Sequence, residues 1–482
     1  MSRPLVVAFG PWLPDGADVA FGVPFQYSPT TIPLADCSNV YYAQGAYRSL
    51  PSPAPLSNAN IGAKCIGAIT VLDASGTPHI YAAQTFDLFI WNGGGYTNVS
   101  KSVSAYVGAQ HWSFVEFAGC ILATDGIHAL QDATIGSGNF ADVTAAPIGN
   151  VLGVIGQFVF VGDIVTGLVS DSNVPYRVYW PAIGDPTSWP TPLTDAATAA
   201  QSGFEDLTQD FGSVMFIGGG PQMGVILQRH GITRASYQGG DTVFSFLPFE
   251  RKRGLIARGA AVQVGAVTHF IADDGFHMTD GSQTVPTGTG QSAALDKWFW
   301  NNVNQNALDS ISAGWDADKK CVVYAVPTGT NTLPDTLVLL NPPSGQWTKA
   351  PVPVERIFSD NDGTRHRLGV FNQQHVLSYL TGVPARGYCE TYDAGFVDGL
   401  ARSVSEATPN VVCTDEPLVR IGVKDAIDDD TSYTGDAARD SFTRRATFDP
   451  PPEGKFLRAR LSSSAASAMH GVTVYLEQGG AA

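Results

Sequence analysis

Short apolar runs alternate with turn-forming residues over most of this chain. Runs of four apolar residues are typical of strands buried on both faces, and three of them are Phe158–Val161, Val214–Ile217 and Leu337–Leu340. Dipeptides that favour tight turns separate such runs, among them Asn92-Gly93, Asp125-Gly126 and Asp274-Gly275. This pattern predicts many short strands joined by hairpins.

One hairpin pattern recurs. Ala123–His128 reads ATDGIH, and Ala272–His277, 149 residues later, reads ADDGFH. A looser relative lies in His79–Gly93, where the second run ends on Trp91. Glycine after aspartate reaches a positive φ angle at little steric cost, which favours a hairpin. Repeated hairpins over a long chain indicate radial or stacked repetition of one β unit.

Helical periodicity is nearly absent. The best candidate is Ser292–Asn306, in which apolar residues at three- and four-residue spacing share one face: Leu295, Trp298, Phe299 and Val303. The fold class predicted from the pattern is therefore all-β.

We expect three regions along the chain. Residues 1–58 are dotted with prolines and only weakly periodic, which predicts an arm that lies on a body or on a neighbour. Residues 59–400 carry the repeated strand patterns of the main body. Residues 401–482 change in texture, from the acidic Asp425–Ser432 to the strand-like Phe456–Leu461 and Val472–Leu476, and predict a smaller C-terminal β region.

Length and composition narrow the picture. A chain of 482 residues exceeds one ordinary core, so it requires several domains or one body built from repeats. Only 15% of the residues are charged, whereas soluble domains average about 25%. Either partners cover much of the surface, or the surface is rich in uncharged polar residues.

The formal net charge of −16 argues against wrapping DNA or docking on an anionic membrane. The densest basic spot, Arg251–Arg253 with Arg258, is interpreted as a solvated turn or a partner contact. An acidic wall does not exclude DNA that passes nearby without sticking, because like charges repel.

The six cysteines lie far apart without a Cys-x-x-Cys pair, which predicts buried free thiols and neither a disulfide framework nor a zinc site. The opening Met1–Pro4 leads into a short apolar run broken by Gly10-Pro11, so no signal peptide is indicated. The most apolar stretch, Ile148–Val165, contains several glycines and Asp163, and it predicts a strand pair and not a membrane span.

The motifs that could bind a cofactor or a metal have simpler explanations. Gly288–Ala293 matches a dinucleotide fingerprint and Asp309 follows at the required distance, but no βαβ unit frames them. The two Asp-Gly-x-His units place each histidine after a turn, which predicts a hydrogen-bonded structural role and not metal ligation. Asp360–Gly363 resembles a calcium loop without its downstream glutamate. We predict no cofactor and no metal.

No catalytic constellation can be chosen either. The stretch Ser359–His366 is a single weak relative of the Asp-box turns of sialidase-type propellers, with Asn361 in place of aspartate and His366 in place of an aromatic residue. Glycosidase chemistry requires two carboxylates that flank a cleft, and the sequence singles out no such pair among 44 acidic residues. We therefore predict that the protein is not an enzyme and has no catalytic residues.

A family resemblance lies in the order of several strings. Val225–Gly240 is an apolar strand with a glycine-rich turn, Phe244-Ser245-Phe246 follows, and Ala272–Phe276, Asp280-Gly281 and Val285–Gly288 come next. The succession resembles the tail nozzle, or tail-hub (packaged-DNA stabilisation), proteins of short-tailed bacteriophages. Further resembling strings are Trp180–Trp189, Gly314–Asp316, Cys321–Tyr324, Leu339–Asn341, Gly345–Trp347 and Gly454–Arg460 before Gly471–Val474. In the last of these, Phe456 stands where tyrosine or arginine-tyrosine is expected.

The resemblance implies a β-propeller body in a structural virion protein without enzymatic activity. It also implies a ring of copies, six in the family, below the portal and the head–tail adaptor ring. Viral DNA would be retained and ejected through the lumen without sequence-specific binding, and fibres, spikes or a plug would be further partners. The expected location is the virion tail, after assembly in the host cytoplasm.

Two other readings stay open. Nine tryptophans and 16 tyrosines could stack on sugar rings in a carbohydrate-binding or glycan-degrading propeller of the tail, although aromatic filling of blades explains them as well. A cellular repeat scaffold is the third reading.

Overall fold

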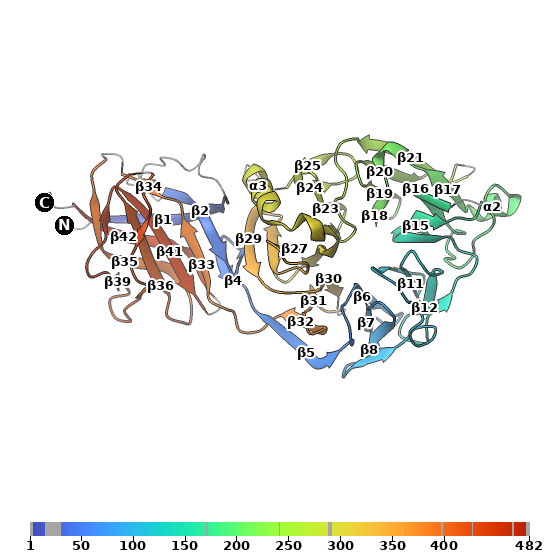
Figure 1. Ribbon diagram of the computed structural model, residues 1–482, viewed down its shortest axis with the longest axis horizontal. Coiled ribbons are helices and arrows are strands. Elements are labelled where there is room, and N and C mark those ends of the chain that lie inside the picture. The colour runs from blue at the N-terminus through green and yellow to red at the C-terminus, as the bar shows by residue number, and fades with distance from the viewer. Residues whose placement is uncertain are drawn as a thin grey trace.

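Two β-rich parts lie side by side in the computed structural model (Figure 1). The structure describes residues 3–14, 30–169, 172–240, 242–287, 292–361, 363–396, 399–426, 428–464 and 467–478. These residues form seven four-stranded sheets, which are the blades of a β-propeller, and one 14-stranded sheet, which we call the second domain. The all-β expectation with a propeller body is confirmed.

Blades 1 to 3 are antiparallel meanders that follow the chain. Blade 1 is β6 (Gly67–Leu72), β7 (Pro78–Ala83), β8 (Leu88–Trp91) and β9 (Tyr96–Asn98). Blade 2 is β10 (Ser113–Phe117), β11 (Cys120–Thr124), β12 (Gln131–Thr134) and β13 (Ala141–Asp142). Blade 3 is β14 (Ile148–Ile155), β15 (Phe158–Thr166), β16 (Ser172–Trp180) and β17 (Gly203–Asp206), with α2 (Asp195–Ala200) before its last strand.

Blades 4 to 6 repeat the arrangement. Blade 4 is β18 (Val214–Gly219), β19 (Met223–Gln228), β20 (Ile232–Tyr237) and β21 (Phe244–Glu250), preceded by the short η1 (Gln209–Phe211). Blade 5 is β22 (Ala261–Val264), β23 (Val267–Ala272), β24 (Gly275–Thr279) and β25 (Thr284–Pro286). Blade 6 is β26 (Ser312–Asp316), β27 (Cys321–Val326), β28 (Thr336–Asn341) and β29 (Gln346–Pro351).

Blade 7 closes the ring with a strand from the other end of the chain. Its strands β30 (Arg356–Asn361), β31 (His366–Phe371) and β32 (Val376–Leu380) are completed by β5 (Pro53–Asn60). The junction with blade 1 is polar: the buried Glu355 carboxylate accepts a hydrogen bond from the Cys65 backbone N at 3.0 Å and lies 2.7 Å from His375 Nδ1. Propeller closure therefore joins residues separated by about 300 positions.

The recurrent hairpin pattern marks equivalent places in the blades. Ala123–His128 leads from the end of β11 toward β12 in blade 2, Ala272–His277 joins β23 to β24 in blade 5, and the looser relative joins β7 to β8 in blade 1. Each is the connection between the second and third strands of its blade. The prediction of radial repetition is confirmed, and 149 residues correspond to three blades of about 50 residues each.

The second domain combines the two ends of the chain. From the N-terminal side come β1 (Arg3–Trp12), β2 (Thr30–Ser38), β3 (Val40–Ala43) and β4 (Ala46–Ser49). The longer strands from the C-terminal side are β33 (Gly387–Thr391), β35 (Arg402–Val412), β36 (Leu418–Lys424), β41 (Phe456–Ser463) and β42 (Ala468–Gln478). Short strands complete it: β34 (Ala394–Gly395), β37 (Ser432–Tyr433), β38 (Ala437–Ala438), β39 (Ala446–Thr447) and β40 (Glu453–Gly454). Strand β1 lies between β42 and β2, and pairs in parallel with β2.

The structure divides the chain differently from the expected boundaries at 58 and 400. Residues expected to form an arm supply four strands of the second domain and β5 of the propeller, and the C-terminal region begins at β33. The prolines that suggested an arm are tolerated inside strands: Pro53 and Pro55 lie in β5, which is the edge strand of its blade and leaves backbone groups unpaired on one side.

The two parts share a core. Trp12 of β1 is 1% exposed and meets Trp298 of α3 (Ser292–Asn302) edge to face at 5.3 Å between ring centroids. Lys349 of β29 extends over both rings and pairs with Asp36 of β2 at 2.8 Å. Burial of the predicted helix face, formed by Leu295, Trp298, Phe299 and Val303, is confirmed, although the helix ends at Asn302 and η2 (Gln305–Ser310) follows.

The strands predicted from the apolar runs also form. The three apolar runs lie in β15, β18 and β28, and Ile148–Val165 is the strand pair β14–β15. All six cysteines are free thiols. Cys37, Cys65, Cys321 and Cys389 are buried as predicted, whereas Cys120 and Cys413 are only partly buried. Within the described part of the chain, no helix has the length and apolar character needed to cross a bilayer.

Candidate functional site

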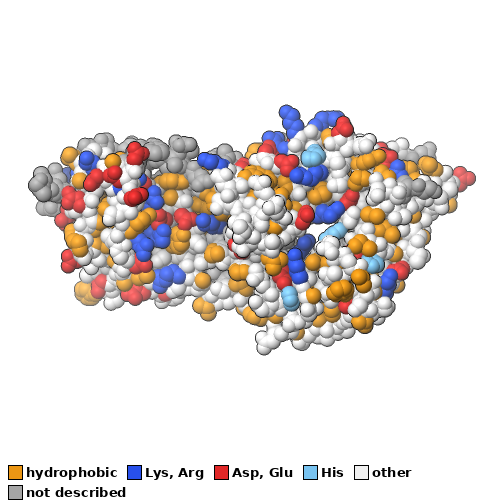
Figure 2. All heavy atoms as spheres, in the orientation of Figure 1, with side chains coloured by type: hydrophobic (Ala, Val, Ile, Leu, Met, Phe, Trp, Pro, Cys, Tyr) orange, Lys and Arg blue, Asp and Glu red, His pale blue; other side chains and the backbone are white. Residues whose placement is uncertain are grey.

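Two hollows lie in different parts of the molecule. The first, which we call the channel cavity, has a volume of about 610 Å³ and lies among the first strands of the blades at the propeller centre. Figure 2 shows the propeller hollowed there, with basic and histidine side chains around the opening. The second, which we call the acidic hollow, has a volume of about 840 Å³ and lies in the second domain between residues 423–437 and 447–453.

The meander topology decides which side chains meet at the channel cavity. Because every blade has four antiparallel strands, its last strand returns the chain to the side from which its first strand started. All first strands therefore run in the same direction, and the residues just before them gather at one face, which we call the entry face. The connections between second and third strands lie on the same face.

Four charged or titratable side chains reach the channel cavity at its entry face. His111 precedes β10, Arg258 precedes β22, Asp309 lies in η2 before β26, and Arg356 is the first residue of β30. Glu116 lines the cavity near the far end of β10. Asp309 and Glu116 are both exposed.

The two arginines are in different electrostatic situations. Arg258 Nη2 donates to Asp163 Oδ2 at 2.5 Å, while its buried Nε has no hydrogen-bond partner. The Arg356 guanidinium makes no hydrogen bond or ion pair with any described residue, and burial lowers its pKa. Cys65 lies near this guanidinium but does not neutralise it, because burial raises the pKa of that thiol to about 12 and leaves it uncharged at neutral pH.

His111 reports the positive charge at this end of the channel cavity. Burial lowers its pKa to about 4, and the nearby charges of Arg258 and Arg356 add to the effect. Its Nε2 lies 3.1 Å from the backbone oxygen of Asn150 in β14, which identifies Nε2 as the protonated nitrogen of the neutral ring. The channel cavity thus offers donors and positive charge at one end, between apolar walls that include Phe216 and Phe358.

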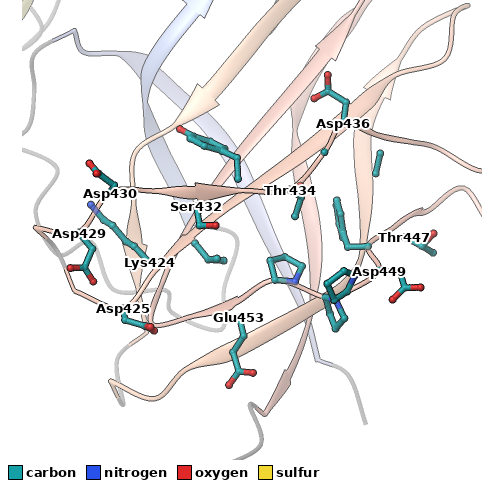
Figure 3. A pocket seen from close by; sticks show the side chains of 18 residues that line it. Lys424, Asp425, Asp429, Asp430, Ser432, Thr434, Asp436, Thr447, Asp449 and Glu453 are labelled. Atoms are coloured by element: carbon teal, nitrogen blue, oxygen red, sulfur yellow. The ribbon is translucent and has the colours of Figure 1, made fainter.

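The acidic hollow does not assemble its carboxylates. Figure 3 shows Asp425, Asp429 and Asp430 on one side, with Asp436 and Asp449 directed elsewhere. Two of these groups have partners nearby: Asp429 accepts from the Ala426 backbone N at 2.8 Å, and Asp436 pairs with Arg420 at 2.9 Å. Across the described ranges, no three residues of the types His, Cys, Asp and Glu are grouped so that they could hold a metal ion.

Each histidine of the two Asp-Gly-x-His units pairs with the aspartate three residues before it. His128 Nδ1 lies 2.7 Å from Asp125 Oδ2, and His277 Nε2 lies 3.6 Å from Asp274 Oδ1. His277 is 2% exposed, and its Nδ1 lies 3.1 Å from the Gly275 backbone oxygen. Both histidines are hydrogen-bonded, as the sequence predicted.

The basic spot of the sequence is divided by the fold. Arg251–Arg253 forms the turn that leaves β21 on the entry face, where Arg253 pairs with Asp274 at 2.7 Å. Arg251 lies over the Phe211 ring at 6.0 Å. Arg258 instead points into the channel cavity, so the four residues do not form one surface.

The remaining motif residues are not brought together. Gly288–Gln291 of the dinucleotide match lies outside the described residues, and Asp309 lies in η2 without a βαβ unit. Asp362 of the calcium-like stretch also lies outside them, and the buried Asp360 carboxylate is bound to Thr70 and, at 3.4 Å, to Arg367.

Acids with perturbed pKa values are dispersed. Burial raises the pKa of five carboxyls, to about 6 for Asp296. They lie in blade 2, blade 3, α3 and blade 7: Asp132, Asp163, Glu205, Asp296 and Asp360. No pair of these flanks a common cleft among the described residues, so the perturbed groups do not define an acid–base site.

Sequence reasoning missed His111 and Arg356 altogether. Neither lies in a motif, and each precedes or begins a different blade, so only the closed ring makes them neighbours. Arg258 belongs to the basic spot of the sequence, but this grouping with Arg251–Arg253 does not predict its position at the cavity.

Comparisons with known proteins add little. No protein-family model matches the chain, and no curated protein matches it. One similar solved structure is the computationally designed Ika8 protein, 9% identical with a TM-score of 0.40, covering 78% of this chain and 99% of that one. Another is BBS1N in complex with ARL6DN, soaked with lead, 12% identical with a TM-score of 0.39, covering 71% and 97%. Likenesses this distant carry no argument about function.

Proposed function

We propose that this chain is a structural protein of a bacteriophage tail, which forms the ring-shaped nozzle below the portal and adaptor. The observation that carries the proposal is the ordered set of strings that resembles the tail nozzle family. In the fold these strings follow one another from β19 through β25 in blades 4 and 5, and continue in β26–β29 of blade 6. Fold alone does not specify function, so the assignment rests on that ordered resemblance.

An apolar surface on the entry face supports a role in assembly. Four exposed side chains from blades 1 and 2 form what we call the apolar patch: Phe86, Val103, Val107 and Ile127. The segments are adjacent, because the Tyr106 backbone N donates to the Phe86 oxygen at 3.1 Å and a Cβ at Gly108 would lie 3.9 Å from Ile127. Clustered exposed apolar residues are typical of surfaces that a partner covers.

In this proposal DNA does not pass through the propeller. The channel cavity has a volume of about 610 Å³, and residues from all seven blades line it. A DNA duplex is too thick to pass through such a space, because its major groove alone is about 12 Å wide. The path for DNA would lie on the axis of the ring, between copies of the chain. A net charge of −16 per copy would keep phosphate from binding to that wall.

The proposal is tested first by location. Mass spectrometry of purified virions and antibody labelling in electron micrographs should place the protein in the tail, below the adaptor. Its absence from the tail would overturn the proposal.

Assembly gives the second test. The double variant V103D/V107D should fold but fail to form rings on a supplied portal–adaptor complex, because two charges would be buried in the contact. The matched control is L193D, which alters an equally exposed apolar residue of blade 3. Rings formed equally by both variants would exclude the apolar patch from assembly.

The carbohydrate reading has less support. None of the nine tryptophans has an exposed side chain, and Tyr433 is the most exposed tyrosine of the described residues. Stacking on a sugar ring requires an accessible aromatic face. A glycan array together with a polysaccharide turnover assay would revive this reading if either gave a specific signal.

A further inference from the structure

The channel cavity contains a charge that the protein does not neutralise. Arg356 points into it without a hydrogen bond or ion pair to the described residues, and the carboxylates that share the cavity are not among its electrostatic neighbours. Arg356 is partly buried, and partial burial of an unpaired cation costs hydration free energy that a nearby anion would offset. Such an arrangement is unfavourable in the free protein and becomes favourable when an anion is bound.

We propose that the entry end of the channel cavity is a binding site for a small oxyanion, a phosphate or carboxylate group, bound by Arg356, with Arg258 adding positive charge at the same end. Arg356 supplies a free planar guanidinium, which suits the two oxygens of such a group. Arg258 keeps one nitrogen on Asp163 and contributes its charge. This inference stands independently of the proposed tail function.

The size of the site limits the ligand. About 610 Å³ falls within the range of small-molecule pockets, roughly 300–1,000 Å³. Apolar side chains of neighbouring blades form the walls, with Trp112, Phe216 and Phe358 among them. The occupant is therefore a small molecule or a single acidic side chain, with its charged group at the arginines.

His111 provides a spectroscopic reporter. A bound anion would oppose the field of Arg258 and Arg356, which now helps to hold the His111 pKa near 4. Anion binding should thus raise the pKa of His111. At a pH near that pKa, binding should therefore be accompanied by uptake of protons by the histidine. Asp125 also acts on this histidine, Asp309 and Glu116 share the cavity, and Asp163 pairs with Arg258.

The decisive experiment is calorimetric titration of the full-length chain with inorganic phosphate, a phosphate monoester and acetate in separate arms. Saturable binding of one of these is expected, and R356M should weaken it by about tenfold or more, as loss of a charge-assisted contact requires. The matched control R251M removes an arginine of the same face that lies outside the cavity, and should bind within about twofold of the wild type. The arms separate a phosphate site from a carboxylate site.

A second measurement keeps the proposal falsifiable if R356M does not fold. The pKa of His111 in the wild-type protein is followed by NMR with and without the anion that binds best. A rise on binding supports the site. No saturable binding of any of the three anions up to about 10 mM, or binding that leaves His111 unchanged, would overturn it.

Discussion

The propeller and the second domain are both built from short strands, yet they are connected in opposite ways. In six blades every strand pairs with its neighbour in the sequence, and β5 is the single long-range insertion into the seventh. In the second domain β1 pairs with β42, β4 with β42 and β2 with β33, across more than 300 positions each. Local pairing leaves hairpin signals in the sequence, whereas pairing between distant segments leaves none.

The difference also concerns folding. Contacts between distant segments are formed only after the entropy of closing a long loop has been lost, which slows folding. Blades 1 to 6 can form as the chain emerges, but the second domain requires β42, almost the last described residues. We therefore expect the propeller to form before the second domain.

The largest effect is expected where the two regions meet. Trp12→Ala removes a fully buried ring that contacts Trp298 across the boundary, and it should cost about 3–5 kcal/mol of unfolding free energy. Urea denaturation should then show the second domain unfolding before the propeller. The control F442A alters a side chain that is 94% exposed and should leave the transition unchanged. A single unchanged transition in Trp12→Ala would contradict a shared core.

Two glycine variants separate the regions. A Cβ at Gly219 would lie 1.5 Å from the Val154 oxygen of the neighbouring blade, and one at Gly471 would lie 2.1 Å from the Val7 oxygen of β1. Each Gly→Ala change should cost about 3 kcal/mol, since a backbone must move. Hydrogen exchange should rise in β14 and β18 for the first variant and in β1 and β42 for the second. G94A, with open space around the new methyl, is the control; matching exchange maps for both variants would refute the separation.

The sequence revealed the blades better than the boundaries between domains. The ATDGIH and ADDGFH strings could be recognised because the second-to-third strand turn selects the same small set of residues in each blade. The buried helix face that contains Leu295 and Trp298 could likewise be predicted, from the three- and four-residue spacing of its apolar residues. Residues 1–58 contain no comparable turn signal, because β1 pairs with β42, near position 472, and not with a neighbour in the sequence. The channel cavity was invisible for the same reason: His111, Arg258 and Arg356 become neighbours only when the ring closes.

Acid should weaken the propeller through its histidines more than the second domain. Burial lowers the pKa of His111 and His269 to about 4, and also lowers that of His277, so these rings fold in the neutral form. Their contribution to the unfolding free energy is complete above pH 6.5. It is lost as the pH falls toward 4, because the unfolded chain takes up protons on these rings before the folded protein does. Between pH 7 and pH 4, the unfolding free energy of H269L should decrease less than that of the wild-type protein, by on the order of 2 kcal/mol. Urea denaturation across this pH range measures the difference.

The second domain supplies the control for that experiment. Its one histidine, His470, is exposed. H470Q, which removes this exposed histidine, is the matched variant for comparison with H269L. An equal slope in H269L and the wild-type protein would show that buried histidines do not cause the loss.

The smallest effect distinguishes two copies of one turn. Asp125 is 3% exposed and accepts hydrogen bonds from the backbone N atoms of Ile127 and His128, at 3.0 and 2.8 Å. D125A should cost about 1–3 kcal/mol by leaving these donors unpaired. The half-exposed Asp274 makes a surface ion pair with Arg253 and lies 3.6 Å from the buried, neutral His277 ring, and D274A should cost less than about 1 kcal/mol. Thermal denaturation of both variants measures the two losses of stability. Equal losses would contradict the structural difference between blades 2 and 5.

The position of the chain ends has a practical consequence. Arg3 lies opposite Leu476 in neighbouring strands, and both ends lie at the extremity of the molecule remote from the propeller (Figure 1). A short peptide linker could therefore join them, and new ends could be opened in a connection between two blades. Such a circular permutant would make the second domain contiguous in the sequence, and would turn its slow, end-to-end assembly into a local one.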